Sequence, residues 1–230
     1  MRIAKYIANA GVCSRREAEK LIEKKKVFIN DLCCEHPSTK VLLSDKVSIN
    51  KKIIKLETKI RLWKMYKPVK TICTNHDPQN RKTIFSLIPK NFPRLISIGR
   101  LDFMSEGLIL FTNNGDYARK CELPSSNILR VYRVCINGSI NNQDVIDINN
   151  GVTINKIEYK KVNIKIEKVK DQYTWLIFKM KEGKNREIRN ICDFYLWNIV
   201  NLVRIQYGSI KLIKQKPAEI IEVENFNEEL

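Results

Sequence analysis

Residues 99–115 read Gly-Arg-Leu-Asp-Phe-Met-Ser-Glu-Gly-Leu-Ile-Leu-Phe-Thr-Asn-Asn-Gly, and this stretch says most about the fold. The chain contains only 8 glycines among its 230 residues, and several of them fall here: Gly99, Gly107 and Gly115. Glycine permits positive φ and the close approach of another surface. Apolar residues before the stretch and at 108–111 predict a strand, a tight polar loop and a second, buried strand. Asp102, flanked by Arg100, then stands at a rigid junction where its carboxylate can face a substrate groove.

The pattern GRLD-x-x-SEGL-x-L-x-TN-x-G resembles the catalytic signature of the ribosomal RNA pseudouridine synthases, in the branch that contains RsuA, RluB, RluE and RluF. The resemblance implies that Asp102 is the catalytic nucleophile. The structural alternative is a strand–turn–strand in which Asp102 only caps the turn. That alternative would account for a bare Arg-Leu-Asp tripeptide, but not for the full run together with the matched segments on both sides of it.

Two downstream segments match the same family. Residues 130–134 alternate like a strand, and Tyr132 stands at the position of the family's active-site tyrosine. Residues 181–189 resemble the third family motif, in which Arg189 takes the place of the basic residue that pairs with the aspartate. Arg186 remains open as an alternative partner, because it lies near the same expected helix start. An ordinary strand aromatic and a basic loop before a helix are the structural alternatives.

The resemblance runs from residue 2 to residue 221 and narrows the branch. Leu123-Pro124-Ser125-Ser126 and the spacing Arg204-x-x-x-Gly208 look most like the RluB branch, which implies large-subunit ribosomal RNA as the substrate. The small-subunit enzyme is the alternative. Lys67-Pro68 resembles the opening turn of the family, but Lys70 stands where the family usually has glycine. We therefore expect a turn with a different φ, or a strained lysine.

Residues 1–58 are expected to form a separate N-terminal domain. Apolar residues at helical spacing predict a helix that includes Ala10 and ends at Gly11. Ser14 and Glu17 form a capping box that begins a second helix, which buries Ala18, Leu21 and Ile22. Strands follow at 27–29 and 47–49. This arrangement resembles a small S4 (αL-type) RNA-binding domain, whereas a DNA-binding helix-turn-helix fits less well because no third helix follows.

The second helix of this domain carries basic residues on one face. Arg16, Lys20 and Lys24 recur at helical spacing, with Arg15 near the helix start. Such a face suits the regularly spaced phosphates of folded RNA, and we expect it to bind RNA. A solvated charged face is the alternative, since Glu19 and Glu23 lie on the same helix.

Composition agrees with an RNA partner. The formal net charge is +17 and the isoelectric point is about 9.6, which favours a polyanionic partner. The 7 cysteines include no C-x-x-C pair and only 2 histidines are available, so no metal-ligand spacing appears. No signal peptide and no apolar stretch long enough for a membrane span is found. We expect a cytoplasmic monomer with reduced thiols and no membrane association.

The residues fit the chemistry that the resemblance implies. Replacing the bond between ribose C1′ and uracil N1 by a bond between C1′ and uracil C5 needs no external oxidant or reductant, so no cofactor and no metal are expected. A carboxylate is needed near C1′, as in glycosidases, and a guanidinium beside it favours its ionised form and fixes its orientation. Asp102 and Arg189 supply this pair, and Tyr132 can stack on the extruded base. The expected RNA contacts in this region are Arg100, Lys184 and Arg186.

Other functional classes fit less well. A noncatalytic S4-type RNA-binding factor with a degenerate synthase fold is expected to lack the aspartate, the tyrosine or the basic partner, and this chain has all three. A two-metal nuclease built on Asp102 and Glu106 needs more clustered carboxylates, and nearby arginines repel cations. A zinc base deaminase is excluded because its His-x-Glu and Pro-Cys-x-x-Cys elements are absent. We therefore expect an α+β enzyme whose catalytic domain spans residues 59–230 and contains a mixed, largely antiparallel sheet.

Overall fold

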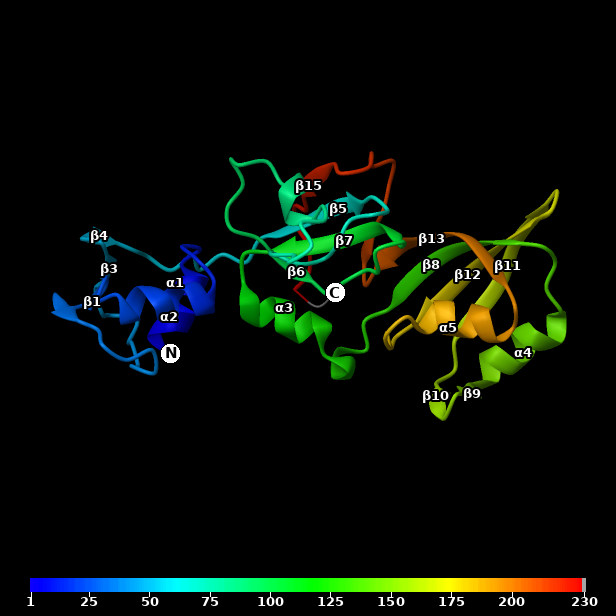
Figure 1. Cartoon of the computed structure of the whole chain (residues 1–230), viewed down its shortest axis with the longest axis horizontal. Coiled ribbons are helices and arrows are strands. Elements are labelled where there is room, and N and C mark those ends of the chain that lie inside the picture. Colours follow the sequence, from blue (N-terminus) through cyan, green and yellow to red (C-terminus); the bar gives the residue numbers. More distant parts are fainter. Residues whose placement is uncertain (229–230) are drawn as a thin grey trace. The chain divides into compact units, whose positions relative to one another are not determined.

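The computed structural model describes residues 1–228, which form two compact units (Figure 1). The first unit comprises residues 1–61, 90–96 and 112–117, and the second comprises residues 62–89, 97–111 and the chain from Ala118 onward. The predicted domain limits, 1–58 and 59–230, remain predictions, and residues 229–230 lie outside the described part.

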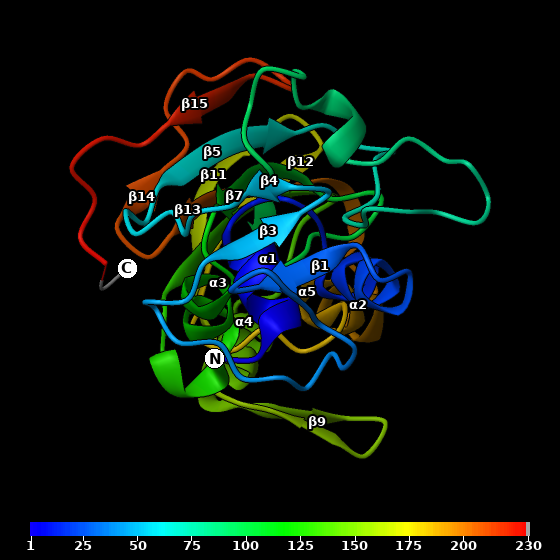
Figure 2. The same cartoon turned by 90° about the vertical axis from the view of Figure 1, so that its left-hand side faces the viewer.

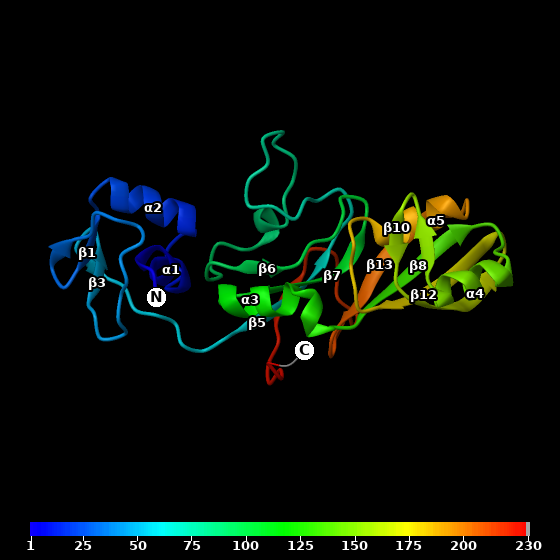
Figure 3. The ribbon, with the colours of Figure 1, turned by 90° about the horizontal axis from the view of Figure 1, so that it is seen from below.

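The N-terminal part folds as two helices against a small sheet (Figure 3). Among the described residues this sheet has four strands in the order β2-β1-β3-β4. Its elements are α1 (Ile3–Asn9), α2 (Arg15–Glu23), β1 (Val27–Ile29), β2 (Leu32–Cys33), β3 (Val47–Ile49) and β4 (Lys52–Ile53). The helix–helix–strand order predicted from the sequence is confirmed, and the two-residue strands β2 and β4 are additions to it.

Local sequence signals explain where these helices begin and end. The capping box is present: the Ser14 side chain accepts a hydrogen bond from the Glu17 backbone at 3.2 Å, and the Glu17 carboxylate accepts one from the Ser14 backbone at 2.8 Å. Gly11 has φ +75°, a conformation that ends a helix. Ala10 lies just beyond α1 as its C-cap, so this helix is shorter than predicted. Leu21 is half-buried rather than buried, because it packs at the margin of the core.

A large mixed sheet organises the second unit. Within residues 1–228 it contains nine strands, with the continuous order β11-β12-β8-β13-β7-β5-β15 and with β6 and β14 attached to β7 and β13. The strands are β5 (Leu62–Lys67), β6 (Ile96–Ile98), β7 (Glu106–Thr112), β8 (Arg130–Asn137), β11 (Asn163–Lys170), β12 (Tyr173–Met180), β13 (Asn198–Tyr207), β14 (Ile210–Lys211) and β15 (Ile220–Glu222). Most pairs are antiparallel, and β13 pairs with β7 in parallel. The predicted α+β class with a largely antiparallel sheet is confirmed.

Helices and a hairpin complete this part of the chain. The helical segments are η1 (Phe85–Leu87), α3 (Gly115–Glu122), η2 (Pro124–Ser126), α4 (Asn142–Asn150) and α5 (Glu187–Phe194). Strands β9 (Val152–Ile154) and β10 (Ile157–Tyr159) form a separate hairpin that projects from the domain (Figure 2). None of the helices in the described chain is long and apolar enough to cross a membrane.

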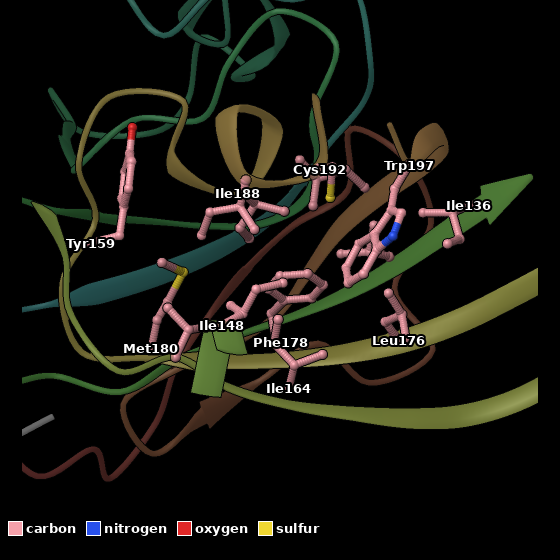
Figure 4. Close-up of a cluster of buried hydrophobic side chains, with 14 of the residues drawn as sticks. Ile136, Ile148, Tyr159, Ile164, Leu176, Phe178, Met180, Ile188, Cys192 and Trp197 are labelled. Atoms are coloured by element: carbon pink, nitrogen blue, oxygen red, sulfur yellow. The ribbon is translucent and has the colours of Figure 1, made fainter. Parts of the chain in front are cut away.

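One face of the β11-β12-β8-β13 half of the sheet forms a hydrophobic core. Directly paired residues on antiparallel strands share a face, so Phe178 and Tyr132, or Leu176 and Val134, point to the same side. Helices α4 and α5 cover that side with apolar residues that include Ile148 and Ile191. Figure 4 shows Ile148, Ile164 and Leu176 around Phe178. The core fixes α5, and with it the residues at the start of that helix.

The other half of the sheet supports the Gly99–Gly115 stretch. Leu108, Ile109, Leu110 and Phe111 of β7 are fully buried, which confirms the predicted buried strand. Strand β7 begins earlier than the apolar run, at Glu106. Because β13 lies between β7 and β8, it joins the two halves of the sheet.

Candidate active site

The polar loop between β6 and β7 holds Asp102 in a tight turn. The Ser105 backbone donates a hydrogen bond to the Asp102 carbonyl at 3.1 Å, and the Lys70 backbone donates to the Phe103 carbonyl at 2.8 Å. Gly99 has φ +71°, and its N–H donates to the Glu122 carboxylate at 2.9 Å. These backbone bonds place the Asp102 carboxylate at the edge of a cavity, with 32% of its side chain exposed.

Arg189, in the first turn of α5, faces Asp102. Its Nε lies 3.6 Å from Asp102 Oδ2, and its Nη2 donates to Ser105 Oγ at 3.1 Å. Burial lowers the pKa of the Arg189 guanidinium, and the Asp102 carboxylate opposes this change. Among residues 1–228, Arg189 Nε is buried without a hydrogen-bond acceptor. Arg189 and Asp102 therefore form an ion pair without a hydrogen bond at Nε, and a small shift of either side chain would allow that bond to form.

Arg186, the alternative partner considered above, lies outside the helix. It is the N-cap residue of α5 and has φ +53°, so it does not continue the helical face that carries Arg189. Arg186 is exposed and lines the same cavity. The geometry favours Arg189 as the residue paired with Asp102.

Tyr132 completes the group. It lies on β8, opposite Phe178 of β12 and Arg204 of β13, and it is half-buried. It lines the same cavity as Asp102 and Arg189, with a volume of about 610 Å³. The cavity also contains the residues expected to contact RNA in this region: Arg100, Lys184 and Arg186. Of the described residues, no group of three or more His, Cys, Asp or Glu side chains could hold a metal ion.

Comparison with known proteins decides the family. The model of the RNA pseudouridylate synthase family matches residues 61–193, which is more than half of the chain and includes Asp102, Tyr132 and Arg189. The chain belongs to this family. The S4 domain model matches residues 1–47 of the synthase, which confirms the expected N-terminal domain.

Relatives of the synthase agree. It is 43% identical to an uncharacterised RNA pseudouridine synthase of Rickettsia typhi over 224 residues, covering 97% of this chain and 92% of that protein. It is 31% identical to the ribosomal large subunit pseudouridine synthase B of Shigella flexneri over 222 residues, which cover 94% of this chain and 77% of that protein. A crystal structure of a pseudouridylate synthase has the same fold, with a TM-score of 0.68 and 21% sequence identity. The match covers 97% of this chain and 96% of the chain in that structure. The resemblance identified in the sequence, including its RluB-like character, is confirmed.

The synthase has a buried lysine beside the site, to which the sequence analysis assigned no role. Lys67 is fully buried at the end of β5, and its Nζ donates to the Ser105 carbonyl at 2.7 Å and to the Pro68 carbonyl at 3.1 Å. Burial lowers the pKa of Lys67 to about 8, against the opposing effect of Cys73, Asp102 and Glu106. The carbonyl of Ser105 thus accepts a hydrogen bond from Lys67, and the hydroxyl of Ser105 accepts one from Arg189. The available signal was a Lys-Pro turn placed directly after an apolar strand.

Arg204 is a second buried cation beside the site. Its side chain is only 2% exposed, its Nε donates to the Leu108 carbonyl at 2.7 Å, and its guanidinium lies 5.2 Å from the Tyr207 ring centroid. It faces the cavity from β13 and ties that strand to β7. Gly107 makes this approach possible: it has φ +101°, and a Cβ there would lie 2.8 Å from the Arg204 backbone nitrogen and closer still to its carbonyl oxygen.

The basic residues predicted in the S4 domain belong to the first unit and do not line the cavity. Arg15, Arg16 and Lys20 are exposed on α2, and Lys24 is the exposed C-cap residue of that helix. Within the first unit Arg15 lies 3.9 Å from Asp116, a weak contact that leaves most of its side chain exposed. Their role in RNA binding remains a prediction.

Proposed function

We propose that this RNA pseudouridine synthase acts on a uridine of large-subunit ribosomal RNA, with Asp102 as the nucleophile. In the reaction the bond between C1′ and N1 breaks, the uracil turns in place, and a bond between C1′ and C5 forms. C5 loses its proton and N1 gains one, so atoms and electrons balance within the nucleotide. The observation that carries the proposal is that Asp102, Arg189 and Tyr132 line one cavity.

The carboxylate of Asp102 supplies negative charge where the reaction needs it. Breaking the glycosidic bond gives C1′ oxocarbenium character, which a nearby carboxylate stabilises or captures. Arg189 orients that carboxylate from the side of α5, while Ser105 holds the guanidinium. Because Arg189 is only 14% exposed, closure of the site by RNA strengthens the pair.

Tyr132 and the surrounding cations act on the extruded nucleotide. The ring of Tyr132 stacks on the uracil and compensates part of the stacking lost from the RNA, and its hydroxyl is available for proton transfer at C5. Arg100, exposed at the cavity, contacts the phosphate of the target nucleotide or fills the space the base has left. Lys184 and Arg186 line the wall of the cavity and contact the backbone.

The choice of ribosomal RNA rests on charge and on relatives. The net charge of +17 and an S4 domain suit a large folded RNA. The relative from Shigella flexneri is named for the large ribosomal subunit. Arg15, Arg16, Lys20 and Lys24 of α2 are the proposed phosphate contacts of the S4 domain.

Replacement of the nucleophile tests the mechanism. Asp102→Asn should abolish pseudouridine formation on ribosomal RNA transcripts, while the RNA affinity stays near that of the wild type and the melting temperature falls by only a few degrees, because the ion pair with Arg189 is lost. Asp171→Asn, at the exposed turn between β11 and β12, is the matched control and should retain full activity. Substantial turnover by Asp102→Asn would refute the assignment.

Mapping identifies the substrate. Carbodiimide-adduct primer extension compares ribosomal RNA from cells with and without the gene, and we expect one pseudouridine of the large-subunit RNA to be lost. Loss of a small-subunit pseudouridine instead would replace the proposed substrate. No lost site in either RNA would refute ribosomal RNA as the substrate.

The S4 contribution is tested by salt dependence. The triple variant Arg16→Gln, Lys20→Gln, Lys24→Gln should weaken binding to ribosomal RNA and reduce the slope of log K against log salt by about 1 for each lost phosphate contact. A control variant removes the same charge from elsewhere in this domain, at Lys51, Lys52 and Lys55. An equal effect of both variants would mean that α2 is no specific contact surface.

A further inference from the structure

A second cavity adjoins the candidate active site. It has a volume of about 1130 Å³ and lies entirely within the second unit. Its walls are the β9–β10 hairpin, the segment 124–129 and the neighbouring ends of β11 and β12. Met180 and Glu187 line both cavities, and residues 181–187 form the wall between them.

The floor of this flanking cavity is apolar and firmly built. Tyr159, Val162 and Met180 are each at most 5% exposed and belong to the core cluster. Figure 4 shows Tyr159 and Met180 at the same end of that cluster. Asn149 exchanges two hydrogen bonds with the backbone of Ile164, which fixes the end of α4 against β11. The cavity therefore presents a preformed apolar surface.

The rim of the flanking cavity is cationic. Five lysines line it: Lys160, Lys161, Lys165, Lys179 and Lys181. Three carboxylates line it, those of Glu158, Glu182 and Glu187, and the last two have nearby partners. Glu182 Oε2 lies 3.7 Å from Lys160 Nζ, and Glu182 Oε1 lies 3.4 Å from Lys184 Nζ. The Glu187 carboxylate accepts a hydrogen bond from the Lys184 backbone at 2.7 Å. The remaining lysines are exposed and give the rim a net positive charge.

The wall between the two cavities is anchored from both sides. Lys184 donates to the Glu158 carbonyl of β10 and lies 5.5 Å from the centroid of the Tyr159 ring. On the other side, Arg130 donates to the Lys181 carbonyl at 2.9 Å. The flanking cavity adjoins the active-site cavity across this wall and has a rim of matching positive charge, so an RNA strand whose target base enters the first cavity can reach the second.

We propose that the flanking cavity binds a nucleotide next to the target uridine in the RNA strand. Lys161, Lys165 and Lys179 contact its phosphates, and the base rests on the apolar floor. The proposal rests on the proposed function, since it requires a target uridine in the first cavity. An apolar floor with a lysine rim suits a nucleotide, which combines a flat base with an anionic backbone, better than it suits an acidic protein segment.

The first experiment measures kinetics on a ribosomal RNA transcript that contains the target. Lys161→Ala with Lys165→Ala should raise KM about tenfold and reduce the salt slope by about 2, while kcat changes little. The control variant replaces Lys168 and Lys170 by alanine; both lie on β11, as Lys165 does, but line neither cavity. Melting temperatures confirm that all variants fold, and Lys161→Arg with Lys165→Arg should restore the wild-type KM.

The second experiment locates the RNA. A photoreactive p-benzoylphenylalanine at position 161 should cross-link the transcript at nucleotides adjoining the target uridine, whereas the same group at position 170 should not. Cross-links only to distant nucleotides, or an unchanged KM in the double alanine variant, would overturn the flanking site. Absence of pseudouridine formation by the wild type would instead refute the proposed function, so the two failures are distinguishable.

Discussion

The pairing of Asp102 with Arg189 can be measured directly. The perturbations are Asp102→Asn, Arg189→Met and the two together. At the observed separation of 3.6 Å, a Coulomb interaction at an effective dielectric constant of about 20 is at most roughly 5 kcal/mol. Because 32% of the Asp102 side chain is exposed, solvent screening and lost hydration reduce the net coupling to about 1–2 kcal/mol.

Urea denaturation of the wild type and the three variants gives the coupling free energy as a double-mutant cycle. This coupling free energy should be smaller in 1 M salt, because the part of the pair that solvent reaches is screened. The comparison pair is Lys5 with Asp116 in the first unit, whose nitrogen–oxygen distance is 2.7 Å but whose side chains are 31% and 57% exposed. That pair should couple by less than about 0.5 kcal/mol.

The same variants report on turnover. Arg189→Met should reduce kcat about 100-fold or more, because the orienting charge is lost at the reacting centre. Arg189→Lys should retain part of the rate, since a point charge replaces a two-pronged contact with Asp102 and Ser105. Arg186→Met should mainly raise KM. A coupling free energy below about 0.3 kcal/mol would refute the pairing. So would the reverse kinetic result, in which Arg186→Met loses kcat while Arg189→Met remains active.

Three further predictions concern stability, each measured by urea denaturation. Gly107→Ala should cost more than about 3 kcal/mol, because its Cβ meets the Arg204 backbone and φ is +101°; a cost below 1 kcal/mol would contradict the close approach. Lys70→Gly should stabilise by about 0.5–1 kcal/mol, because Lys70 has φ +58°, whereas Lys90→Gly should destabilise. Burial lowers the pKa of Lys67 from 10.5 to about 8, so between these values the unfolded chain binds the extra proton and the free energy of unfolding rises with pH. Wild type should therefore gain up to about 3 kcal/mol over Lys67→Met between pH 7 and pH 11; parallel pH profiles would contradict this.

Local signals predicted the parts of the fold that depend on neighbouring residues. The capping box at Ser14 and the glycine at position 11 defined two helices, because both act within one helical turn. The turn at Lys70 illustrates the limit. The sequence left open a changed turn or a strained lysine, and the structure shows φ +58°, so the left-handed turn persists with a lysine in it. Its backbone N–H donates to the carbonyl of Phe103, so this turn is tied to the loop that holds Asp102.

The buried cations at the site could not be predicted in the same way. Lys67 and Arg204 look like surface residues in a chain with 42 lysines and arginines. Their burial depends on partners far along the chain: the Ser105 carbonyl for Lys67 and the Leu108 carbonyl for Arg204. Similarly, the ion pair of Arg189 with Asp102 joins α5 to the loop before β7. Contacts between residues far apart in the chain determine each of these features, and local propensity carries no trace of them.

The position of β13 has a consequence for how the enzyme matures. Strands β7 and β8 follow one another in the chain, yet β13, from residues 198–207, lies between them in the sheet. Asp102 precedes β7, whereas Tyr132 lies on β8, so the strand that brings their two halves of the sheet together is synthesised after both of them. Contacts across such long sequence separations form late and slowly. A nascent chain that already displays its S4 domain has therefore not yet brought Asp102 and Tyr132 together, and their assembly must await the emergence of β13 from the ribosome.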